Sequence, residues 1–182
     1  MEWYRQGKPG RVLGHEIAGQ VVAVGEGVTD FKIGERISAS HHLPCFECHL
    51  CRMGQHTLCE TFRSTNFDPG GFAELTRLPP INVRHGVYKL PGQLSFDEAT
   101  FIEPLACVVR GQRKIGVRPG QTILVIGCGV SGLLHIMLAR QLGVQRILAC
   151  DINDFRLDAA QRFGADELFP FDEKFSEKLH KR

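Results

Sequence analysis

Residues 121–143, QTILVIGCGVSGLLHIMLARQLG, decide how the second half of this 182-residue chain folds. Ile123–Ile126 is a continuous apolar run, typical of a buried strand, and it leads straight into a glycine-rich turn. A helical pattern follows the turn, with apolar positions at Leu133, Leu134, Ile136, Met137 and Leu138. Gly143 stands where a helix commonly ends. The stretch therefore predicts a strand, a tight turn and a helix in direct succession.

The residues after this stretch repeat the same alternation. RILACD, residues 146–151, is a second apolar run, and DFRLDAAQRFG, residues 154–164, is a second helical segment that ends at a glycine. A third strand is expected near Glu167–Phe169. Strands that alternate with helices in this way predict a parallel sheet of the α/β class.

The turn itself, Gly127–Gly132, matches the pattern G-x-G-x-x-G. Alone this pattern is weak, but here it has a strand before it, a helix after it and the acidic residue Asp151 about twenty positions on. Gly127 would allow the tight turn, Gly129 would let the backbone approach a pyrophosphate, and Gly132 would let helix and strand pack closely. The helix N-terminus would present free N–H groups to the phosphates.

Asp151 favours NAD as the ligand of this loop. Its carboxylate would accept hydrogen bonds from the adenosine ribose hydroxyls and would repel the 2′-phosphate of NADP. Arg156 is the nearest basic residue downstream and would either flank the adenine or lie on the surface. A glycine turn without a ligand and a site for FAD or another nucleotide are the alternatives. The predicted cofactor-binding residues are Gly127, Gly129, Val130, Ser131, Gly132, Asp151 and Arg156.

Two shorter helices are expected upstream. Ser95 and Glu98 form an S-x-x-E capping box, which predicts the start of a helix. A second helix is expected from Pro104 to Arg110, with the proline at its first position.

From residue 11 to about 92 the pattern is one of short strands. We expect strands in GQVVAVGEGV (Val21, Val22 and Val24), on both sides of Gly34 in FKIGERISAS, and in GGFAELTRL after Gly70 and Gly71. Short strands separated by Gly and Pro turns predict a small β-barrel, and KLPGQL after them is typical of a linker.

The segment CFECHLCRMGQHTLC, residues 45–59, holds four of the chain's seven cysteines. The spacing of Cys45, Cys48, Cys51 and Cys59 suits a tetrahedral zinc ion bound by four thiolates, a closed arrangement that is structural and not catalytic. His49 and His56 lie inside the segment as competing ligands, and four unliganded buried thiols are the other alternative.

Composition and termini exclude several classes of protein. The formal net charge is +2 and no basic stripe with interleaved aromatic residues is present, so we expect no nucleic-acid partner. No apolar run approaches the ~20 residues of a membrane span. The first residues, MEWYRQGKPGRVLG, contain no apolar signal core. We therefore expect a cytoplasmic protein, in which clustered cysteines bind metal and do not form disulfides.

Further candidate metal ligands are His15, Glu16, Glu103 and Cys107. His15 and Glu16 are adjacent and would point to opposite faces of a regular strand, although Gly14 permits a bend. Glu103 and Cys107 are four residues apart and would share one face of a helix. Each also has a structural interpretation: His15 as a core histidine, Glu103 as a helix N-terminal charge and Cys107 as a small buried residue.

Together these motifs resemble the zinc-dependent medium-chain dehydrogenases, which join a GroES-like β-barrel to a Rossmann domain. The resemblance rests on GHEIAGQVVAVGEGV, CFECHLCRMGQHTLC, EPLACV and VIGCGVSG followed by Asp151. EPLACV is most similar to the branch that contains sorbitol and threonine dehydrogenases. The implied domains are a GroES-like domain at 1–92, with its zinc lobe at about 41–62, and a Rossmann domain at 93–182.

The resemblance implies an NAD-dependent alcohol or polyol dehydrogenase. It implies a structural zinc on the four cysteines and a catalytic zinc on His15 with Glu16 and Glu103, a carboxylate being favoured over Cys107. That zinc would act as a Lewis acid on the oxygen of a secondary alcohol or polyol, which passes hydride to NAD. Relatives are usually dimers or tetramers, so a homo-oligomer is expected.

The chain departs from the family pattern at both ends. The family's first catalytic ligand is a cysteine roughly two dozen residues before Gly-His-Glu, and none of the fourteen residues before His15 is cysteine. Only two or three strands of a Rossmann sheet of about six are expected. The resemblance thus implies an internal part of a longer chain, with an incomplete barrel and half a Rossmann domain. The alternative function is a non-catalytic, zinc-stabilised fragment with residual nucleotide binding.

Overall fold

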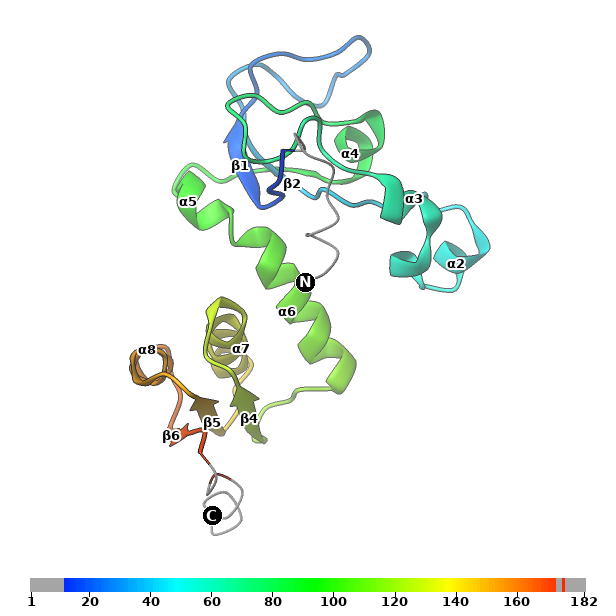
Figure 1. The fold of residues 1–182 in the computed structure, drawn as a ribbon. Coiled ribbons are helices and arrows are strands. Elements are labelled where there is room, and N and C mark those ends of the chain that lie inside the picture. The colour runs from blue at the N-terminus through cyan, green and yellow to red at the C-terminus, as the bar shows by residue number, and fades with distance from the viewer. Residues whose placement is uncertain (1–11, 173–174, 176–182) are drawn as a thin grey trace. The chain divides into compact units, whose positions relative to one another are not determined.

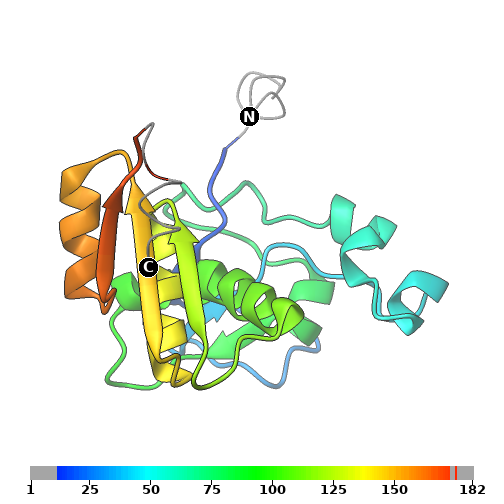
Figure 2. The ribbon, with the colours of Figure 1, turned by 90° about the horizontal axis from the view of Figure 1, so that it is seen from below.

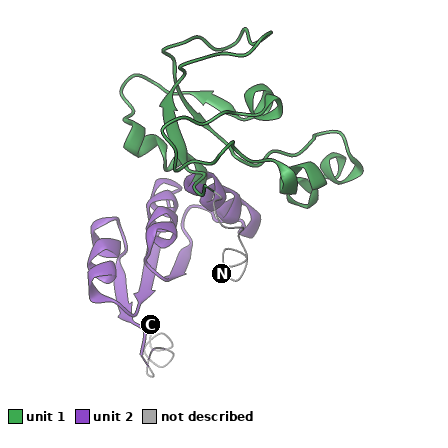
Figure 3. Ribbon diagram, turned by 45° about the horizontal axis from the view of Figure 1, so that its top comes forward, with its two compact units in different colours: residues 1–103 green, residues 104–182 purple. Residues whose placement is uncertain are grey.

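The computed structural model describes residues 12–172 and residue 175. Contacts divide the chain into two compact units, residues 1–103 and residues 104–182 (Figure 3). The first eleven residues, on which the absence of a signal core was argued, lie outside the described residues. So do most of the residues after Asp172.

The second unit is built on a parallel sheet. Its strands are β4 (Thr122–Ile126), β5 (Arg146–Asp151) and β6 (Glu167–Pro170), in that spatial order. The connections are α7 (Val130–Gln141) and α8 (Asp154–Arg162). Two successive right-handed crossovers in the same direction place both helices on one face of the sheet, where Figures 1 and 2 show α7 and α8 side by side. The predicted α/β alternation is confirmed.

The alternation of β5 side chains divides the core of this unit into two. Ile147 and Ala149 point toward the helices and are fully buried with Ile136 of α7 and Ala160 of α8. Leu148 and Cys150 point to the opposite face, where they pack with Phe169 of β6. A parallel strand that is buried on both faces needs apolar residues on both, which explains the continuous apolar run in RILACD.

The helices upstream of this sheet begin near the predicted residues. The Ser95–Glu98 capping box forms, with both of its hydrogen bonds, at the start of α5 (Phe96–Ala99). The next helix, α6 (Ile102–Ile115), starts earlier and ends later than the predicted Pro104–Arg110 segment. Pro104 is tolerated in its first turn because N–H groups there have no intrahelical acceptor. The side-chain amide of Gln112 joins α6 to α7 by donating to the carbonyl of His135 at 2.8 Å.

The first unit contains an antiparallel sheet of β1 (Ile17–Gln20), β2 (Arg36–Ala39) and β3 (Val87–Lys89), in the order β1-β2-β3. The strand expected at Val21–Val24 lies earlier, at β1, and Val22 and Val24 are exposed. Of the two strands expected around Gly34, only β2 forms.

The strand expected after Gly70 and Gly71 is also absent from the described residues, where Asp68 and Arg77 form only an isolated bridge. The two glycines instead allow this segment to lie close against the backbone of residues 12–14. A Cβ on Gly70 would lie 2.4 Å from the Val12 carbonyl oxygen, and one on Gly71 would lie 2.7 Å from the Gly14 carbonyl carbon. The backbone N–H of Gly71 donates to Gly14 and that of Phe72 to Leu13, both at 2.8 Å.

Short helices complete the first unit: α2 (His49–Arg52), η1 (His56–Leu58), α3 (Glu60–Ser64) and α4 (Pro80–His85). The linker expected after β3 is held by Arg36, whose guanidinium donates to the Gly92 carbonyl at 2.9 Å and lies over the Phe96 ring. These contacts group residues 93–103 with the first unit. The predicted domain boundary between residues 92 and 93 stays a prediction.

Within the part of the chain that the structure describes, every helix is too short or too polar to cross a bilayer.

Candidate metal and nucleotide sites

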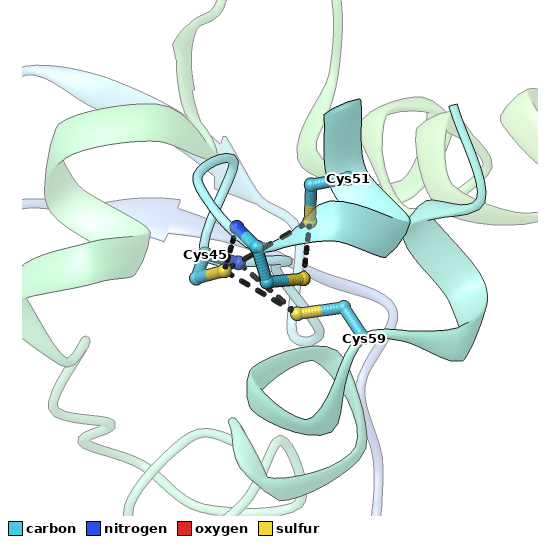
Figure 4. A group of neighbouring side chains, drawn as sticks. Cys45, Cys51 and Cys59 are labelled. Atoms are coloured by element: carbon cyan, nitrogen blue, oxygen red, sulfur yellow. Dashed lines mark hydrogen bonds between the residues drawn. The ribbon is translucent and has the colours of Figure 1, made fainter. Parts of the chain in front are cut away.

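The four clustered cysteines converge in a lobe formed by α2, η1 and the start of α3. Figure 4 shows the sulfur atoms of Cys45, Cys51 and Cys59 turned toward one another. The Sγ–Sγ distances are 3.9 Å for Cys45–Cys51, 3.6 Å for Cys48–Cys51 and 3.7 Å for Cys45–Cys59. A tetrahedron with metal–sulfur bonds of about 2.3 Å has edges of about 3.8 Å, so the spacing fits zinc. All seven cysteines are unbridged.

Backbone N–H groups point at these sulfur atoms. The N–H of Cys48 donates to Cys45 Sγ at 3.3 Å and that of Cys45 to Cys59 Sγ at 3.4 Å. The N–H groups of Cys45 and Phe62 lower the pKa of Cys59 to about 6, whereas burial raises the pKa of Cys51 to about 12. Four thiolates this close repel one another unless a cation lies between them. The donor set therefore suits a closed structural zinc site, and residues 45, 48, 51 and 59 would hold it.

The turn that begins the lobe explains how the sulfur atoms meet. Phe46 adopts a left-handed backbone with φ of 63°, which folds the chain back between Cys45 and Cys48. Gly54, with φ of 73°, ends the α2 segment and returns the chain toward Cys59. His49 and His56 are exposed and are not members of the four-sulfur group.

A second group of metal-ligating side chains lies in the same unit. It consists of His15, His41 and Glu103, and one ligand atom from each lies within 4.8 Å of the other two. His15 Nε2 is 3.9 Å from Glu103 Oε2, and the rings of His15 and His41 are 4.2 Å apart. The three side chains are partly buried. The structure therefore brings together two of the predicted ligands, His15 and Glu103, with a histidine that the sequence analysis had not assigned.

The register of β1 and β2 explains the pairing. Ile17 lies opposite Ala39, so the same register continued outward sets His15 opposite His41. Residues directly opposite in an antiparallel pair present their side chains on the same face. Glu16 is exposed and is not one of the three grouped residues. Cys107 lies one turn beyond Glu103 on α6 and is also exposed.

His41 and His42 differ in their surroundings. Burial lowers the pKa of His41 to about 3, with repulsion from His42 and His15 adding to the effect. Its Nδ1 is buried and has no hydrogen-bond partner among the described residues. The Nδ1 of His42, in contrast, donates to the Thr65 carbonyl at 2.5 Å. His41 is thus held as the neutral imidazole, which is the form that binds metals.

The glycine loop has the geometry that a dinucleotide requires. Gly127 has φ of 90°, and a Cβ on Gly132 would lie 1.9 Å from the Gly127 carbonyl oxygen, so both positions need glycine. A Cβ on Gly129 would meet no atom within 4 Å, which leaves open space in front of the loop. The first helical bond runs from the Leu133 N–H to Gly129 at 2.9 Å. The N–H groups of Val130, Ser131 and Gly132 precede it, at the helix end where anions bind.

Asp151 lies at the end of β5 beside this loop. One carboxylate oxygen accepts from the Cys128 N–H at 2.7 Å and the other from the Asn153 N–H at 2.9 Å. The Cys128 bond is the main reason that the pKa of Asp151 is lowered. The guanidinium of Arg156 stands 3.9 Å from the same carboxylate, and its side chain is about half exposed. The buried anion therefore remains charged, with acceptor capacity left for a ligand's hydroxyl groups.

Comparison with known proteins places these sites in a family. The model of the alcohol dehydrogenase GroES-like domain matches residues 1–92. The chain is 38% identical over 160 residues to "Probable D-xylulose reductase A" of Aspergillus clavatus, covering 87% of this chain and 44% of that protein. It is 37% identical over 155 residues to L-threonine 3-dehydrogenase of Francisella tularensis subsp. novicida, covering 85% of this chain and 43% of that protein.

Solved structures agree with these relatives. The alcohol dehydrogenase TADH from Thermus sp. ATN1 superposes with a TM-score of 0.77 at 36% identity, over 90% of this chain and 48% of that one. A dehydrogenase from Sinorhizobium meliloti 1021, solved with bound NADP, superposes with a TM-score of 0.80 at 30% identity, over 90% and 47%. The chain thus spans less than half the length of the relatives that it matches. It belongs to the zinc-dependent medium-chain dehydrogenase family, with part of a GroES-like domain followed by part of a Rossmann domain.

Proposed function

We propose that this chain carries the zinc and NAD sites of an oxidoreductase that transfers hydride between NAD and a secondary alcohol or polyol. The observation that carries the proposal is that one chain holds both a partly buried His15–His41–Glu103 group and a glycine loop joined to Asp151. A ligand group with an open position suits a Lewis acid, and the loop suits a dinucleotide. The named relatives, a xylulose reductase and a threonine dehydrogenase, support the substrate class.

Each residue has a role in this proposal. His15 and Glu103 would hold the catalytic zinc, which when bound polarises the alcohol oxygen. Glu16 is the other carboxylate that we assign to this site, and Cys107 is the alternative to a carboxylate ligand. Cys45, Cys48, Cys51 and Cys59 would hold the structural zinc. The proposed domains are residues 1–92, with the zinc lobe at about 41–62, and residues 93–182.

The choice of NAD over NADP rests on Asp151. Its carboxylate is buried, charged and fixed by two backbone N–H groups, so it cannot turn away from an added 2′-phosphate. Ribose hydroxyls, in contrast, can donate to it. Gly127, Gly129, Val130, Ser131 and Gly132 would bind the pyrophosphate, and Arg156 would flank the adenine. We also propose a cytoplasmic location and a homodimer or homotetramer.

A second function has an observation in its favour. The chain spans less than half the length of its relatives, so a zinc-stabilised chain that binds nucleotide without catalysis is the alternative. Both candidates are tested by incubating the purified chain with NAD⁺ and a panel of sugar alcohols, amino alcohols and simple secondary alcohols. NADH formation that disappears in His15→Ala supports the enzyme. No NADH formation, together with binding of ADP-ribose, supports the alternative.

A further inference from the structure

We infer that His41 is the third protein ligand of the catalytic metal, so that His15, His41 and Glu103 bind a Zn²⁺ ion with residues of this chain alone. The inference rests on the proposed function, because it completes the ligand set of the same site. It differs from the cysteine ligand that the family resemblance implies. It also assigns a role to a residue that the sequence analysis had not assigned.

Backbone pairing places the two histidines together. The register Ile17–Ala39, Ala18–Ser38, Gly19–Ile37 and Gln20–Arg36 leads outward to His15 and His41 at the same end of the sheet. The hydroxyl of Ser38 adds a bond to the Ile17 carbonyl at 2.9 Å, which fixes this end of the pair. The two imidazoles therefore lie close together, tilted by 37°, for a structural reason that does not depend on metal. Glu103 then supplies a carboxylate 3.9 Å from His15.

The backbone of His41 is also held in place. The amide of Asn82, on α4 and fully buried, donates to the Ser40 carbonyl at 2.7 Å and to the His41 carbonyl at 3.2 Å. The N–H of Ser40 donates to the Gly86 carbonyl at 2.8 Å. A ligand side chain on a fixed backbone loses little conformational entropy when a metal binds.

The side chain of His41 has one ring nitrogen without a hydrogen-bond partner among the described residues. This nitrogen, Nδ1, is buried. A buried polar atom without a partner is unfavourable, and metal coordination through this nitrogen would remove that cost. His42, the neighbouring histidine, is not one of the three grouped residues.

The donor set suits zinc. Two imidazoles and one carboxylate are a known catalytic combination, and they leave the fourth position of a tetrahedron open for a substrate oxygen. Ligand atoms about 2.0–2.1 Å from zinc lie about 3.3–3.4 Å from one another. The three ligand atoms lie within 4.8 Å of one another, so small side-chain rotations close the site.

The test is metal content by elemental analysis of the purified chain and four single variants, each reconstituted with zinc and desalted. With two sites present, we expect about two zinc ions in the chain and in His42→Ala, and about one in His41→Ala, His41→Gln and His15→Ala. The zinc retained by the cysteine lobe reports that each variant has folded. His42→Ala is the matched control, since it removes the neighbouring imidazole from the same loop.

Cobalt gives a readout that does not depend on stoichiometry. With zinc in the cysteine lobe and Co²⁺ in the second site, we expect visible bands without sulfur-to-cobalt charge transfer. His41→Cys should add that charge-transfer band, because the new thiolate would bind the same ion.

Each remaining outcome overturns the inference in a recognisable way. About one zinc in the unaltered chain means that these three residues do not bind metal by themselves. Loss of zinc in His15→Ala but not in either His41 variant means that the site exists and a different group is the third ligand. The second result leaves the proposed function intact. Failure of the proposed function shows separately, as two bound zinc ions without NAD-linked oxidation.

Discussion

The carboxylate of Asp151, at the end of β5, accepts a hydrogen bond from the backbone N–H of Cys128, inside the glycine loop, at 2.7 Å. The residue expected to recognise the ribose therefore also fixes the loop expected to bind the pyrophosphate. Both functions depend on one buried negative charge.

Removal of that charge should weaken the discrimination between NAD and NADP. In Asp151→Asn the side chain keeps one acceptor oxygen for the loop but no longer repels a 2′-phosphate. We expect the ratio of the NADPH to the NADH dissociation constant to fall by about tenfold or more, which corresponds to about 1.4 kcal/mol. Fluorescence titration of both reduced cofactors measures it. An unchanged ratio would mean that another residue selects the cofactor.

Asp151 should also contribute pH-dependent stability to the second unit. Its folded pKa is lowered from 3.8, chiefly by the Cys128 N–H, so the contribution is fully present above pH 3.8 and is lost as pH falls further. A charged hydrogen bond of this kind contributes about 1.5–3 kcal/mol. Hydrogen exchange of β4 and β5 amides should therefore be faster in Asp151→Asn at neutral pH, and the difference between the two proteins should shrink as pH falls below 3.8. A constant difference across this range would contradict the assignment.

Two glycines of the loop should respond to alanine in opposite ways. Gly132→Ala sets a Cβ against the Gly127 carbonyl, at 1.9 Å before relaxation, and should destabilise the second unit by about 1–3 kcal/mol or more. Gly129→Ala meets no atom within 4 Å and should leave thermal unfolding nearly unchanged. It should nevertheless lower NADH affinity, because the methyl group fills the space proposed for the pyrophosphate. Thermal melts and NADH titrations of both variants make the comparison, and full NADH affinity in Gly129→Ala would place the pyrophosphate elsewhere.

Local signals in the sequence predicted the second unit well. The apolar runs of β4 and β5 and the glycines after α7 and α8 each act over a few residues, so they can be recognised without tertiary structure, as can the Ser95–Glu98 capping box of the first unit. The cysteine lobe was predictable for the same reason, since three of its ligands lie within seven residues.

The first unit was less predictable because its strands are short and depend on partners distant in sequence. Val21–Val24 has strand composition but lies beyond the end of β1. Gly70 and Gly71 allow close contact with the backbone of residues 12–14 and do not begin a strand. His41 could not be assigned from the sequence, since its place opposite His15 depends on the β1–β2 register. The alternation of adjacent residues on a strand did predict that His15 and Glu16 would not share a face, and only His15 belongs to the three-residue group.

The zinc lobe should depend on each of its four thiolates and not on the exposed Cys107. Cys59 is fully buried, and its sulfur accepts the Cys45 N–H, so Cys59→Ser removes both a ligand and a fixed acceptor. We expect that variant to lose about one zinc ion per chain and to expose residues 45–64 to rapid hydrogen exchange, because zinc binding and local folding are coupled. Cys107→Ser, the matched control, should keep its full zinc content and its protection. Loss of zinc in Cys107→Ser would instead identify Cys107 as a ligand of the catalytic ion and would displace the carboxylate from that role.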